Sequence, residues 1–242
     1  MPIRETLFIS DLHLDASREH LIRLCLDLFE GRAEQADALY ILGDLFEAWI
    51  GDDDDNPAYT EVKAGLHQLT QSGVPVFVMQ GNRDFLLGDD FCRETGCQLL
   101  ADPCVVELYG KPTLLMHGDT LCTKDTGYLQ LRQILHNPAW QQDFLSKPLA
   151  DRRAMAEHLR AESQKQTSQK DMAIMDVTPE AVADVMREHQ VTHLIHGHTH
   201  RPAIHDFKLD EQDVRRTVLG DWYEKGSLLE LTQDSCQLHT FG

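Results

Sequence analysis

Five polar motifs constrain this chain more than any other feature, because each follows closely on a short apolar run. Apolar runs of this length are typical of buried β-strands. In an open α/β sheet, ligands bind beyond the carboxyl ends of the strands. We therefore expect the motifs to meet in one crevice. They are Asp11-Leu12-His13, Gly43-Asp44, Gly81-Asn82-Arg83-Asp84, His117-Gly118-Asp119 and Gly197-His198-Thr199-His200, after the runs 7–9, 39–42, 76–79, 114–116 and 194–195.

The side chains of these motifs offer carboxylate, amide and imidazole ligands. That mixture suits divalent first-row metals such as Mn²⁺, Fe²⁺ or Zn²⁺ better than a thiolate site would. A two-metal site clamps the attacking and the leaving oxygens of a phosphoryl displacement, and its ions need a bridging anion. Asp44 is the candidate bridge, so the sequence predicts a dinuclear metallohydrolase. The candidate ligands are Asp11, His13, Asp44, Asn82, His117, His198 and His200.

The spacing within two motifs also predicts local geometry. Residues two apart in an extended segment share one face, so Asp11 and His13 are expected to point the same way. The same argument applies to His198 and His200. His196 would share that face, but its position inside an apolar run indicates a structural role. The acidic run at 52–55 is expected to be a solvated loop rather than a metal site.

Composition bounds the class of protein. The chain has 242 residues with 42% hydrophobic and 26% charged side chains, typical of a globular protein with one substantial core. No stretch approaches the roughly 18 consecutive apolar residues of a spanning helix. The first six residues lack the apolar core of a signal peptide, which predicts a cytoplasmic location. The six cysteines form no Cys-x-x-Cys pair, so we expect reduced thiols and neither a disulfide framework nor a structural zinc site.

The net charge of −18 argues against nucleic acid as a partner, because it opposes attraction to phosphates. No obligate protein partner is evident either. The charge is uneven: residues 1–122 carry −14 and residues 173–242 carry −6, whereas residues 123–172 carry +2. This shift predicts a core made of 1–122 and 173–242, interrupted by a helical insertion at 123–172.

The insertion combines apolar bulk with basic side chains, which leaves two interpretations open. It could be a helical hairpin that only packs its own apolar face on the core. Alternatively, it could be a lid beside the metals, with cations for phosphate and an apolar inner wall for a hydrophobic ligand. Basic amphipathic segments also favour anionic membrane surfaces. The spacing of the residues does not separate these interpretations.

Periodicity outside the insertion predicts an alternation of strands and helices. Helical patterns are expected at 19–30, 58–71 and 85–94, between the strands that precede the first motifs. Later strands are expected at 105–108, 113–116, 217–219, 228–231 and 237–240. Short connections between alternating elements favour a layered α/β fold. We predict a mixed two-sheet β-sandwich flanked by helices.

The motifs, in this order, resemble those of the calcineurin-like metallophosphoesterase family: Asp-x-His, Gly-Asp, Gly-Asn, His and Gly-His-x-His. The resemblance covers nearly the whole chain and implies the same two-sheet fold. It also implies how the ligands divide between two ions, with Asp44 shared. One ion would be held by Asp11, His13, Asp44 and His200, and the other by Asp44, Asn82, His117 and His198.

One position departs from the family pattern. Many family phosphatases have His after the Asn, where it is thought to act as a general acid, whereas this chain has Arg83. Arg cannot give up a proton at working pH, but it can hold phosphate oxygens bidentately. Arg83 therefore suits a leaving group that needs no proton, such as phosphate leaving from a pyrophosphate. Together, Asp44 and Arg83 are the predicted catalytic residues.

Longer segments at 40–53, 81–86, 116–123, 174–177 and 195–203 resemble a branch of this family that acts in lipid A biosynthesis. The resemblance implies hydrolysis of a UDP-linked diacylglucosamine by metal-activated water at the uridine-side phosphorus. Two divalent ions, typically Mn²⁺, would be required. The insertion would cover the acyl chains, and the protein would associate peripherally with the cytoplasmic face of the inner membrane. The implied substrate contacts are Asn82, Arg83, Asp125, Ser163, Thr167, Lys170 and His198.

Two other hypotheses remain. The first is a pyrophosphatase or phosphodiesterase with a soluble nucleotide substrate. Comparing hydrolysis rates on acylated and deacylated UDP-glucosamine would distinguish it from an enzyme that acts on the lipid. The second is a catalytically silent scaffold that keeps the fold for protein binding. Lost ligands would mark such a scaffold, and all seven predicted ligand positions are filled here.

Overall fold

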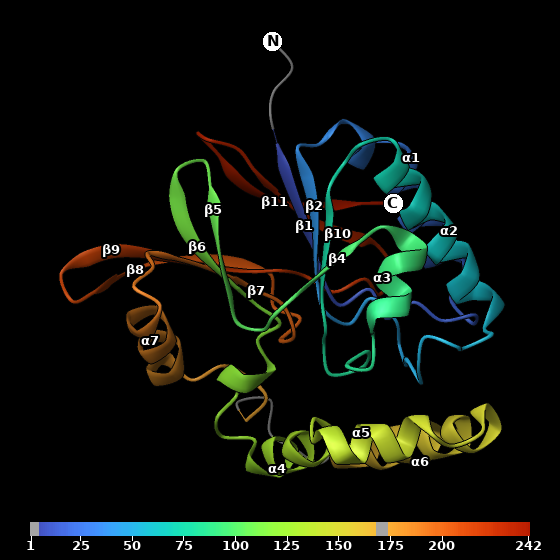
Figure 1. Ribbon diagram of the computed structural model, residues 1–242. Coiled ribbons are helices and arrows are strands. Elements are labelled where there is room, and N and C mark those ends of the chain that lie inside the picture. Colours follow the sequence, from blue (N-terminus) through green and yellow to red (C-terminus); the bar gives the residue numbers. More distant parts are fainter. Residues whose placement is uncertain (1–4, 168–173) are drawn as a thin grey trace.

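The computed structural model describes residues 5–167 and 174–242, which form two β-sheets with helices around them (Figure 1). The first sheet has six strands in the order β11-β10-β1-β2-β3-β4, and β1 to β4 run parallel. In chain order its strands are β1 (Thr6–Ile9), β2 (Ala38–Leu42), β3 (Val76–Met79), β4 (Gln98–Leu100), β10 (Gly226–Leu231) and β11 (Cys236–Phe241).

The second sheet has five strands in the order β5-β6-β7-β9-β8. Its central strands β6, β7 and β9 are parallel, and β5 and β8 close the two edges antiparallel to their neighbours. The strands are β5 (Cys104–Leu108), β6 (Lys111–Met116), β7 (His193–His196), β8 (Ala203–Leu209) and β9 (Gln212–Val218). The carboxyl ends of the parallel strands in both sheets therefore carry the five motifs.

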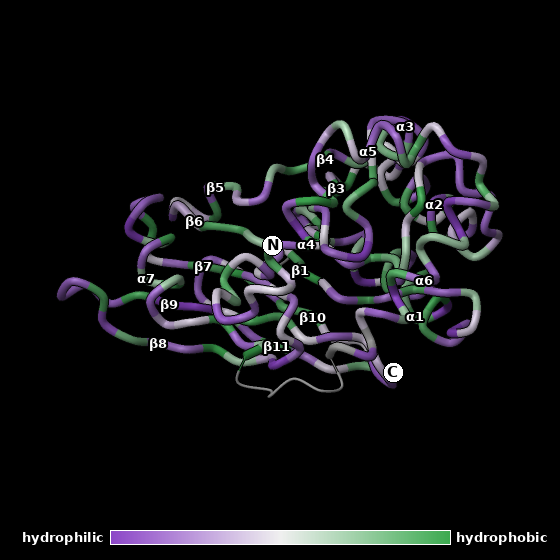
Figure 2. The backbone as a smooth tube through the Cα atoms, turned by 90° about the horizontal axis from the view of Figure 1, so that it is seen from below, coloured by the Kyte–Doolittle hydropathy of each residue, from purple (hydrophilic) through white to green (hydrophobic). Residues whose placement is uncertain are grey.

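Apolar side chains of both sheets pack against each other to form the centre of a sandwich. The ring of Tyr40 stacks between Phe8 and Phe77, with ring centroids 4.8 and 4.7 Å apart. Leu115 and Ile195 of the second sheet belong to the same buried cluster. Strands β1 and β2 are buried along their whole length, as expected when both faces of a parallel strand are covered. Seen from below, β1 and β3 run largely in green (Figure 2).

Helices cover the outer faces of the two sheets. Helices α1 (Glu19–Glu30), α2 (Pro57–Gln71) and α3 (Asp89–Thr95) pack on the first sheet, and α7 (Pro179–Glu188) packs on the second. The α1 stripe at 21, 22, 25, 28 and 29 is buried, in agreement with its 3.6-residue period. The predicted two-sheet sandwich flanked by helices is confirmed.

The insertion contributes three helices at one end of the sandwich, where the motif loops also lie (Figure 1). They are α4 (Thr126–Leu135), α5 (Pro138–Leu145) and α6 (Leu149–Thr167). The Asp125 and Asn137 side chains cap the first two by accepting hydrogen bonds from Tyr128 N and Ala139 N. The division of the chain at 122 and 173 stays a prediction. Within the described parts of the chain, no helix combines the length and apolar character needed to cross a bilayer.

Some predicted elements differ from the structure. The helix expected at 85–94 begins at Asp89, because residues 85–88 form turns and the Asp52 carboxylate accepts hydrogen bonds from Gly88 N and Phe91 N at the helix start. The strand expected at 217–219 is the end of the longer β9, which pairs with β8. Strands β4 and β8 and helix α7 were not predicted. Pairing with β3 and β9 defines the two strands, whereas α7 is amphipathic and buries Val182 and Met186 against the second sheet.

The expectation of a solvated acidic loop at 52–55 holds for Asp53 and Asp55, whose side chains are 63% and 75% exposed, but it missed the contacts that this loop makes. The Asp53 carboxylate pairs with Arg152 of α6, which is almost fully buried and also donates to Ile50 O at 2.7 Å. Arg153 reaches the next two carboxylates, with Nη2 to oxygen distances of 3.2 and 2.9 Å. The acidic run therefore docks the insertion onto the core. Its partners lie 98 or 99 residues away in the chain, beyond the reach of local patterns.

Candidate metal centre

The first two motifs meet because their loops continue the pairing of β1 and β2. Asp11 N donates to Gly43 O at 3.1 Å, and His13 N donates to Asp44 O at 2.9 Å. The predicted extended geometry is wrong, since φ is +54° at Asp11 and +49° at His13. Both side chains reach the site because these backbone hydrogen bonds hold the loop there, and not because alternate residues of a strand share one face.

Positive φ angles recur in the last motif and at the candidate bridge. The angles are +54° at Asp44, +68° at His198 and +55° at His200. A side chain in this left-handed region strains the backbone by on the order of 1 kcal/mol, and such strain persists only where surrounding contacts enforce it. Five of the seven predicted ligands therefore occupy strained positions, which is characteristic of functional sites.

Glycines allow the motif loops to approach one another closely. A Cβ atom on Gly81 would lie 2.2 Å from Asp44 Oδ1, and one on Gly43, where φ is +88°, would lie 2.4 Å from His117 Nδ1. Neither position could hold a larger residue without moving a predicted ligand. The Gly-Asp and Gly-Asn motifs therefore reflect steric requirements of the site.

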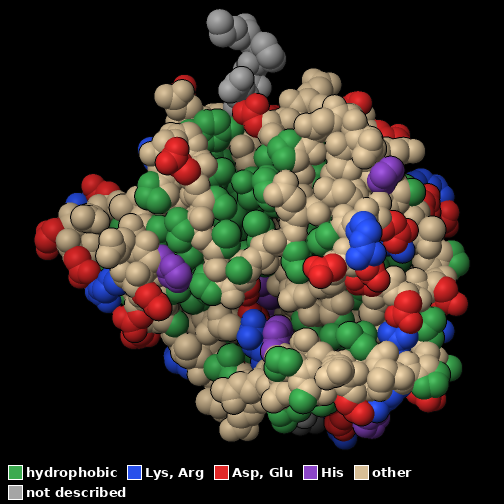
Figure 3. Space-filling model, in the orientation of Figure 1, with side chains coloured by type: hydrophobic (Ala, Val, Ile, Leu, Met, Phe, Trp, Pro, Cys, Tyr) green, Lys and Arg blue, Asp and Glu red, His purple; other side chains and the backbone are tan. Residues whose placement is uncertain are grey.

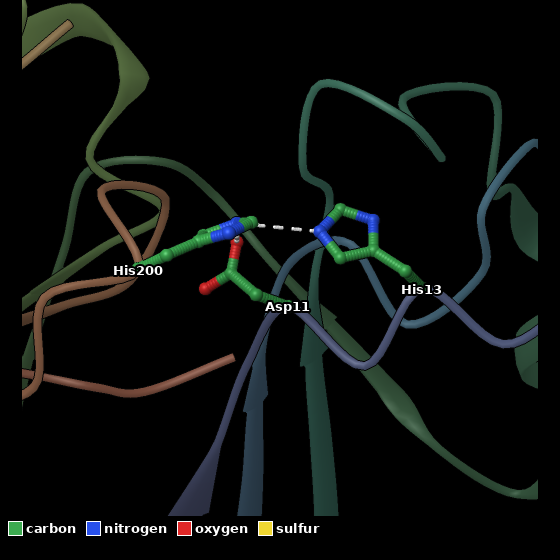
Figure 4. Close-up of side chains that lie close together, drawn as sticks. All are labelled: Asp11, His13 and His200. Carbon is green, nitrogen blue, oxygen red and sulfur yellow. Dashed lines mark hydrogen bonds and ion pairs between the residues drawn. The ribbon is translucent and has the colours of Figure 1, made fainter. Parts of the chain in front are cut away.

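One group of predicted ligands consists of Asp11, His13 and His200 (Figure 4). The two imidazoles face each other, with Nε2 atoms 3.3 Å apart, and Asp11 Oδ1 lies 3.4 Å from His200 Nε2. Asp11 is fully buried, and its Oδ1 has no hydrogen-bond partner among the described residues. Its Oδ2 is held by Ser10 Oγ and His198 N at 2.5 and 2.9 Å. A buried carboxylate oxygen that faces two imidazole nitrogens fits a cation.

The second group surrounds the amide of Asn82. Asn82 Oδ1 lies 2.9 Å from His117 Nε2 and 2.8 Å from His198 Nδ1. His117 Nδ1 lies 3.0 Å from the carbonyl oxygen of Leu42, which leaves its Nε2 facing the site. Burial lowers the pKa of His198 to about 4, with a further lowering from His117. This keeps the His198 imidazole neutral, the form that binds metals.

Asp44 lies between the two groups. Its Oδ2 is 3.8 Å from His13 Nε2, and its Oδ1 is 3.8 Å from His117 Nε2. Arg83 N donates to Oδ1 at 2.8 Å. One oxygen of this carboxylate therefore faces a histidine of the first group, and the other oxygen faces a histidine of the second group. A bridging ligand requires this arrangement. Asp11, Asp44 and His117 also place ligand atoms within 4.8 Å of one another.

Two carboxylates that sequence reasoning missed contact the far nitrogens of the first group. Glu47 Oε2 lies 3.1 Å from His13 Nδ1, and Asp221 Oδ2 lies 3.3 Å from His200 Nδ1. Burial raises the pKa of Glu47, but His13, Arg83 and Arg160 outweigh it and bring the value to about 2. Carboxylates in this position orient metal-binding imidazoles. Neither lies within a metal motif, so no local signal marks them.

Asp84 supports the loop that carries Asp44. Its buried carboxylate accepts hydrogen bonds from Gly81 N at 2.8 Å, Leu45 N at 2.7 Å and Asp44 N at 3.2 Å. Burial and the nearby charge of Asp44 raise the pKa of Asp84 to about 6. Asp84 belongs to the third motif, but only the structure shows that its carboxylate holds the backbone of the loop that carries Asp44.

Asp119 of the fourth motif connects the site to α4 of the insertion. Its carboxylate accepts hydrogen bonds from Tyr128 OH and, at 2.6 Å, from Arg132 Nε. Burial opposes the charged form, but His117, His198 and Arg132 hold the pKa of Asp119 well below its ordinary value. The insertion is therefore tied to the loop after β6 by a buried charged group.

The remaining predicted residues are placed as follows. Arg83 is half-buried beside Asn82, and its Nε has no hydrogen-bond partner among the described residues. Asp125 is the N-cap of α4, and Ser163 is half-buried on α6. The side chain of Thr167 and the whole of Lys170 lie outside the described residues. The substrate contacts stay predictions, whereas all seven predicted metal ligands lie together.

His196 is fully buried at the end of β7, and its Nδ1 lies 2.9 Å from Gly197 O. Burial lowers its pKa to about 3. This position is consistent with the structural role expected from the sequence. All six cysteines are free thiols, as expected.

Figure 3 shows basic and histidine side chains gathered between the core and the helices of the insertion. A separate surface hollow of about 670 Å³ lies over the second sheet and the β10–β11 turn. None of the described site residues lines that hollow. The candidate site is therefore the place where the motif loops face the insertion.

The fold and the geometry of the site define the class of the protein: a metal-dependent hydrolase built on a two-sheet sandwich. The family model for calcineurin-like phosphoesterases matches residues 5–202, and the chain belongs to this family. Its site accordingly uses divalent metal.

Curated relatives narrow the comparison. The UDP-2,3-diacylglucosamine hydrolase of Pseudomonas entomophila is 52% identical over 235 residues, which cover 97% of this chain and 98% of the relative. The proteins of the same name from Pseudomonas aeruginosa PAO1 and Enterobacter sp. 638 are 53% and 50% identical, over 93% and 98% of this chain and 94% and 98% of the relatives. The solved structure of an archaeal phosphodiesterase shares the fold, with a TM-score of 0.51 at 12% identity over 98% of this chain and 99% of that one.

Proposed function

We propose that this protein hydrolyses the pyrophosphate bond of UDP-2,3-diacylglucosamine. The products are UMP and 2,3-diacylglucosamine 1-phosphate (lipid X), an intermediate of lipid A biosynthesis, and water attacks the uridine-side phosphorus. The relatives that carry this activity in their names match almost the whole chain at about 50% identity. The observation that carries the reaction class is the convergence of two ligand groups on Asp44.

The donor set fits two divalent ions, for which we propose Mn²⁺. One would be held by Asp11, His13, Asp44 and His200, and the other by Asp44, Asn82, His117 and His198. Bound ions supply an activated water and positive charge that stabilises the pyrophosphate oxygens. Asp11 Oδ1, which accepts no hydrogen bond from the described residues, and the close approach of two imidazoles support this assignment independently of the relatives.

Arg83 acts on the phosphate oxygens in this proposal. Its backbone N–H holds Asp44, which fixes the residue next to the site, and its half-buried guanidinium has donors available there. A guanidinium keeps its proton at working pH and forms two parallel hydrogen bonds to phosphate. A leaving phosphate needs no proton, so the absence of a general-acid histidine is compatible with pyrophosphate cleavage.

The insertion supplies the lipid specificity. Its helices face the site and expose apolar side chains, including Ile134 at 56% and Leu145 at 41%. Asp125, Ser163, Thr167 and Lys170, with Asn82, Arg83 and His198, are the proposed substrate contacts. We place the protein peripherally on the cytoplasmic face of the inner membrane, where a diacylated substrate is found.

The test is Mn²⁺-dependent hydrolysis of UDP-2,3-diacylglucosamine in ¹⁸O-labelled water, with the label located by mass spectrometry. We expect the label in UMP, which reports attack at the uridine-side phosphorus. Label in the lipid phosphate would contradict the assigned position of attack. Turnover of deacylated UDP-glucosamine or soluble dinucleotides, without turnover of the lipid, would favour the soluble-nucleotide alternative. Inactivity towards all of these substrates would favour the scaffold hypothesis.

A further inference from the structure

The loop that follows β2 carries one predicted ligand and also contacts the insertion. Asp44 lies at its start, and Asp53 to Asp55 pair with α6 further along. Between them, Glu47 N donates to Leu14 O at 3.0 Å, which places Glu47 beside the loop of His13. A single loop therefore touches the metal centre and the lid within a few residues.

The Glu47 carboxylate divides its two oxygens between these partners. Oε2 lies 3.1 Å from His13 Nδ1, an ion-pair contact that is not aligned as a hydrogen bond, and Oε1 accepts a hydrogen bond from Arg160 Nη2 at 2.6 Å. The Glu47 side chain is 12% exposed and that of His13 is 10% exposed. A carboxylate this buried needs paired donors, because desolvation otherwise disfavours its charge. Arg160 supplies one of the donors to the Glu47 carboxylate. The Nε atom of Arg160 makes no hydrogen bond with the described residues.

The position of this carboxylate bears on which nitrogen of His13 can bind metal. A carboxylate next to Nδ1 favours the tautomer that carries its proton there, and this frees Nε2 as a ligand. Nε2 is the atom that faces His200 and Asp44. Loss of an outer carboxylate of this kind typically weakens metal affinity about 10- to 100-fold.

We propose that Glu47 is a positioning residue that couples the insertion to one metal position: it orients His13 while Arg160 of α6 orients Glu47. The inference rests on the proposed metal centre and extends it to a residue outside the metal motifs. The contact of Arg160 with Glu47 therefore sets the affinity of the ion bound by His13, and this contact does not reach the ion bound by Asn82 and His117.

The chain offers a matched control for this coupling. Arg153 extends from the same helix to the same loop, but it pairs with Asp54 and Asp55 and not with Glu47. Replacing Arg153 with Met removes a lid-to-core ion pair made by a more exposed arginine, 47% exposed against 32% for Arg160. Replacing Arg160 with Met removes the one that reaches His13 through Glu47. A difference between these two variants isolates the coupling from general loosening of the lid.

The experiment titrates metal-free full-length protein with Mn²⁺ and follows free Mn²⁺ by electron paramagnetic resonance. We expect wild-type protein to bind two ions. Glu47→Gln, which offers one acceptor to two donors, should weaken one of them about 10- to 100-fold and leave the other unchanged. Arg160→Met should weaken the same ion by roughly tenfold or less, and Arg153→Met should match wild type. Thermal unfolding of each metal-free variant controls for folding.

The double variant sharpens the test. If Arg160 acts through Glu47, combining Arg160→Met with Glu47→Gln should weaken Mn²⁺ binding no more than Glu47→Gln alone. Two wild-type-like Mn²⁺ affinities in Glu47→Gln would overturn the proposal. So would equal affinities in Arg160→Met and Arg153→Met, or additive losses in the double variant. A wild-type protein that binds no Mn²⁺ would overturn the metal centre together with this inference, whereas lost lipid hydrolysis with normal Mn²⁺ binding would affect only the proposed substrate.

Discussion

The sandwich and the insertion place their functional residues by different means. In the sandwich, ligands follow buried parallel strands and are held by short backbone hydrogen bonds, several at positive φ. In the insertion, α4 has no fully buried side chain, and Arg132, Arg152 and Arg160 make ion pairs with carboxylates of the core. The comparison suggests that backbone geometry places the predicted ligands of the core, and that ion pairs together with the buried Phe144 of α5 set the position of the insertion.

The strongest test of the core is Asp44→Ala. Without the carboxylate between the two groups, we expect activity to fall by about 10³-fold or more, because several kcal/mol of charge stabilisation depend on the paired ions. Steady-state rates on the lipid substrate and metal content by mass spectrometry measure the effect. Substantial remaining activity in a folded variant would contradict the bridging role.

The corresponding test of the insertion replaces residues 126–173 with a short linker. We expect hydrolysis of the acylated substrate to be lost, since the proposed acyl contacts are removed. Mn²⁺ should still bind, with one site weakened through loss of Arg160. A folded variant with wild-type activity on the lipid would exclude the lid function and leave only the packing interpretation.

Arg83→Ala tests chemistry in the core without removing a ligand. We expect turnover to fall about 100-fold, because an oriented donor to the transition state is lost. Metal content should be unchanged. Arg83→Lys serves as the control, since it keeps the charge but loses the bidentate geometry, and should recover only part of the rate. Loss of metal from Arg83→Ala would make its role structural.

Docking of the lid can be tested through stability. Arg152→Met removes a buried guanidinium that donates to two carbonyl groups and to Asp53, so we expect a loss of about 1–3 kcal/mol in the free energy of unfolding. Arg153→Met, at a side chain that is 47% exposed, should cost much less, because solvent screens exposed ion pairs. Urea unfolding measures both. Equal effects would show that burial of the arginine does not matter.

The smallest expected effect concerns His193, which is in the core but outside the site. Burial lowers its pKa to about 4, with further lowering by Arg215 and Lys111. The unfolded chain then binds more protons below about pH 6.5, so this contribution to stability is complete above that pH and falls as pH decreases towards 4. Between pH 6.5 and 5.5 the loss should stay below about 1.4 kcal/mol. Urea unfolding of wild type and His193→Gln should show a shallower pH dependence in the variant; identical slopes would contradict this assignment.

Much of the fold could be predicted because its signals are local. The α1 pattern predicted its bounds correctly, and β3 coincides with the apolar run at 76–79. The long strand β8 was missed, since none of its side chains is fully buried, its apolar residues do not alternate regularly, and pairing with β9 stabilises it. The docking contacts of the acidic run at 52–55 were missed because its arginine partners belong to a distant helix.

The sequence by itself determined which candidate ligands meet at the site and in what order they occur, because apolar runs, glycines and polar side chains follow one another along the chain. Only the tertiary structure decided which residues support those ligands. Glu47 reaches Arg160 across 113 residues, and Asp84 reaches the backbone of Asp44 across 40. Such contacts depend on how whole elements pack in three dimensions, and periodicity reports only neighbours on the same strand or helix.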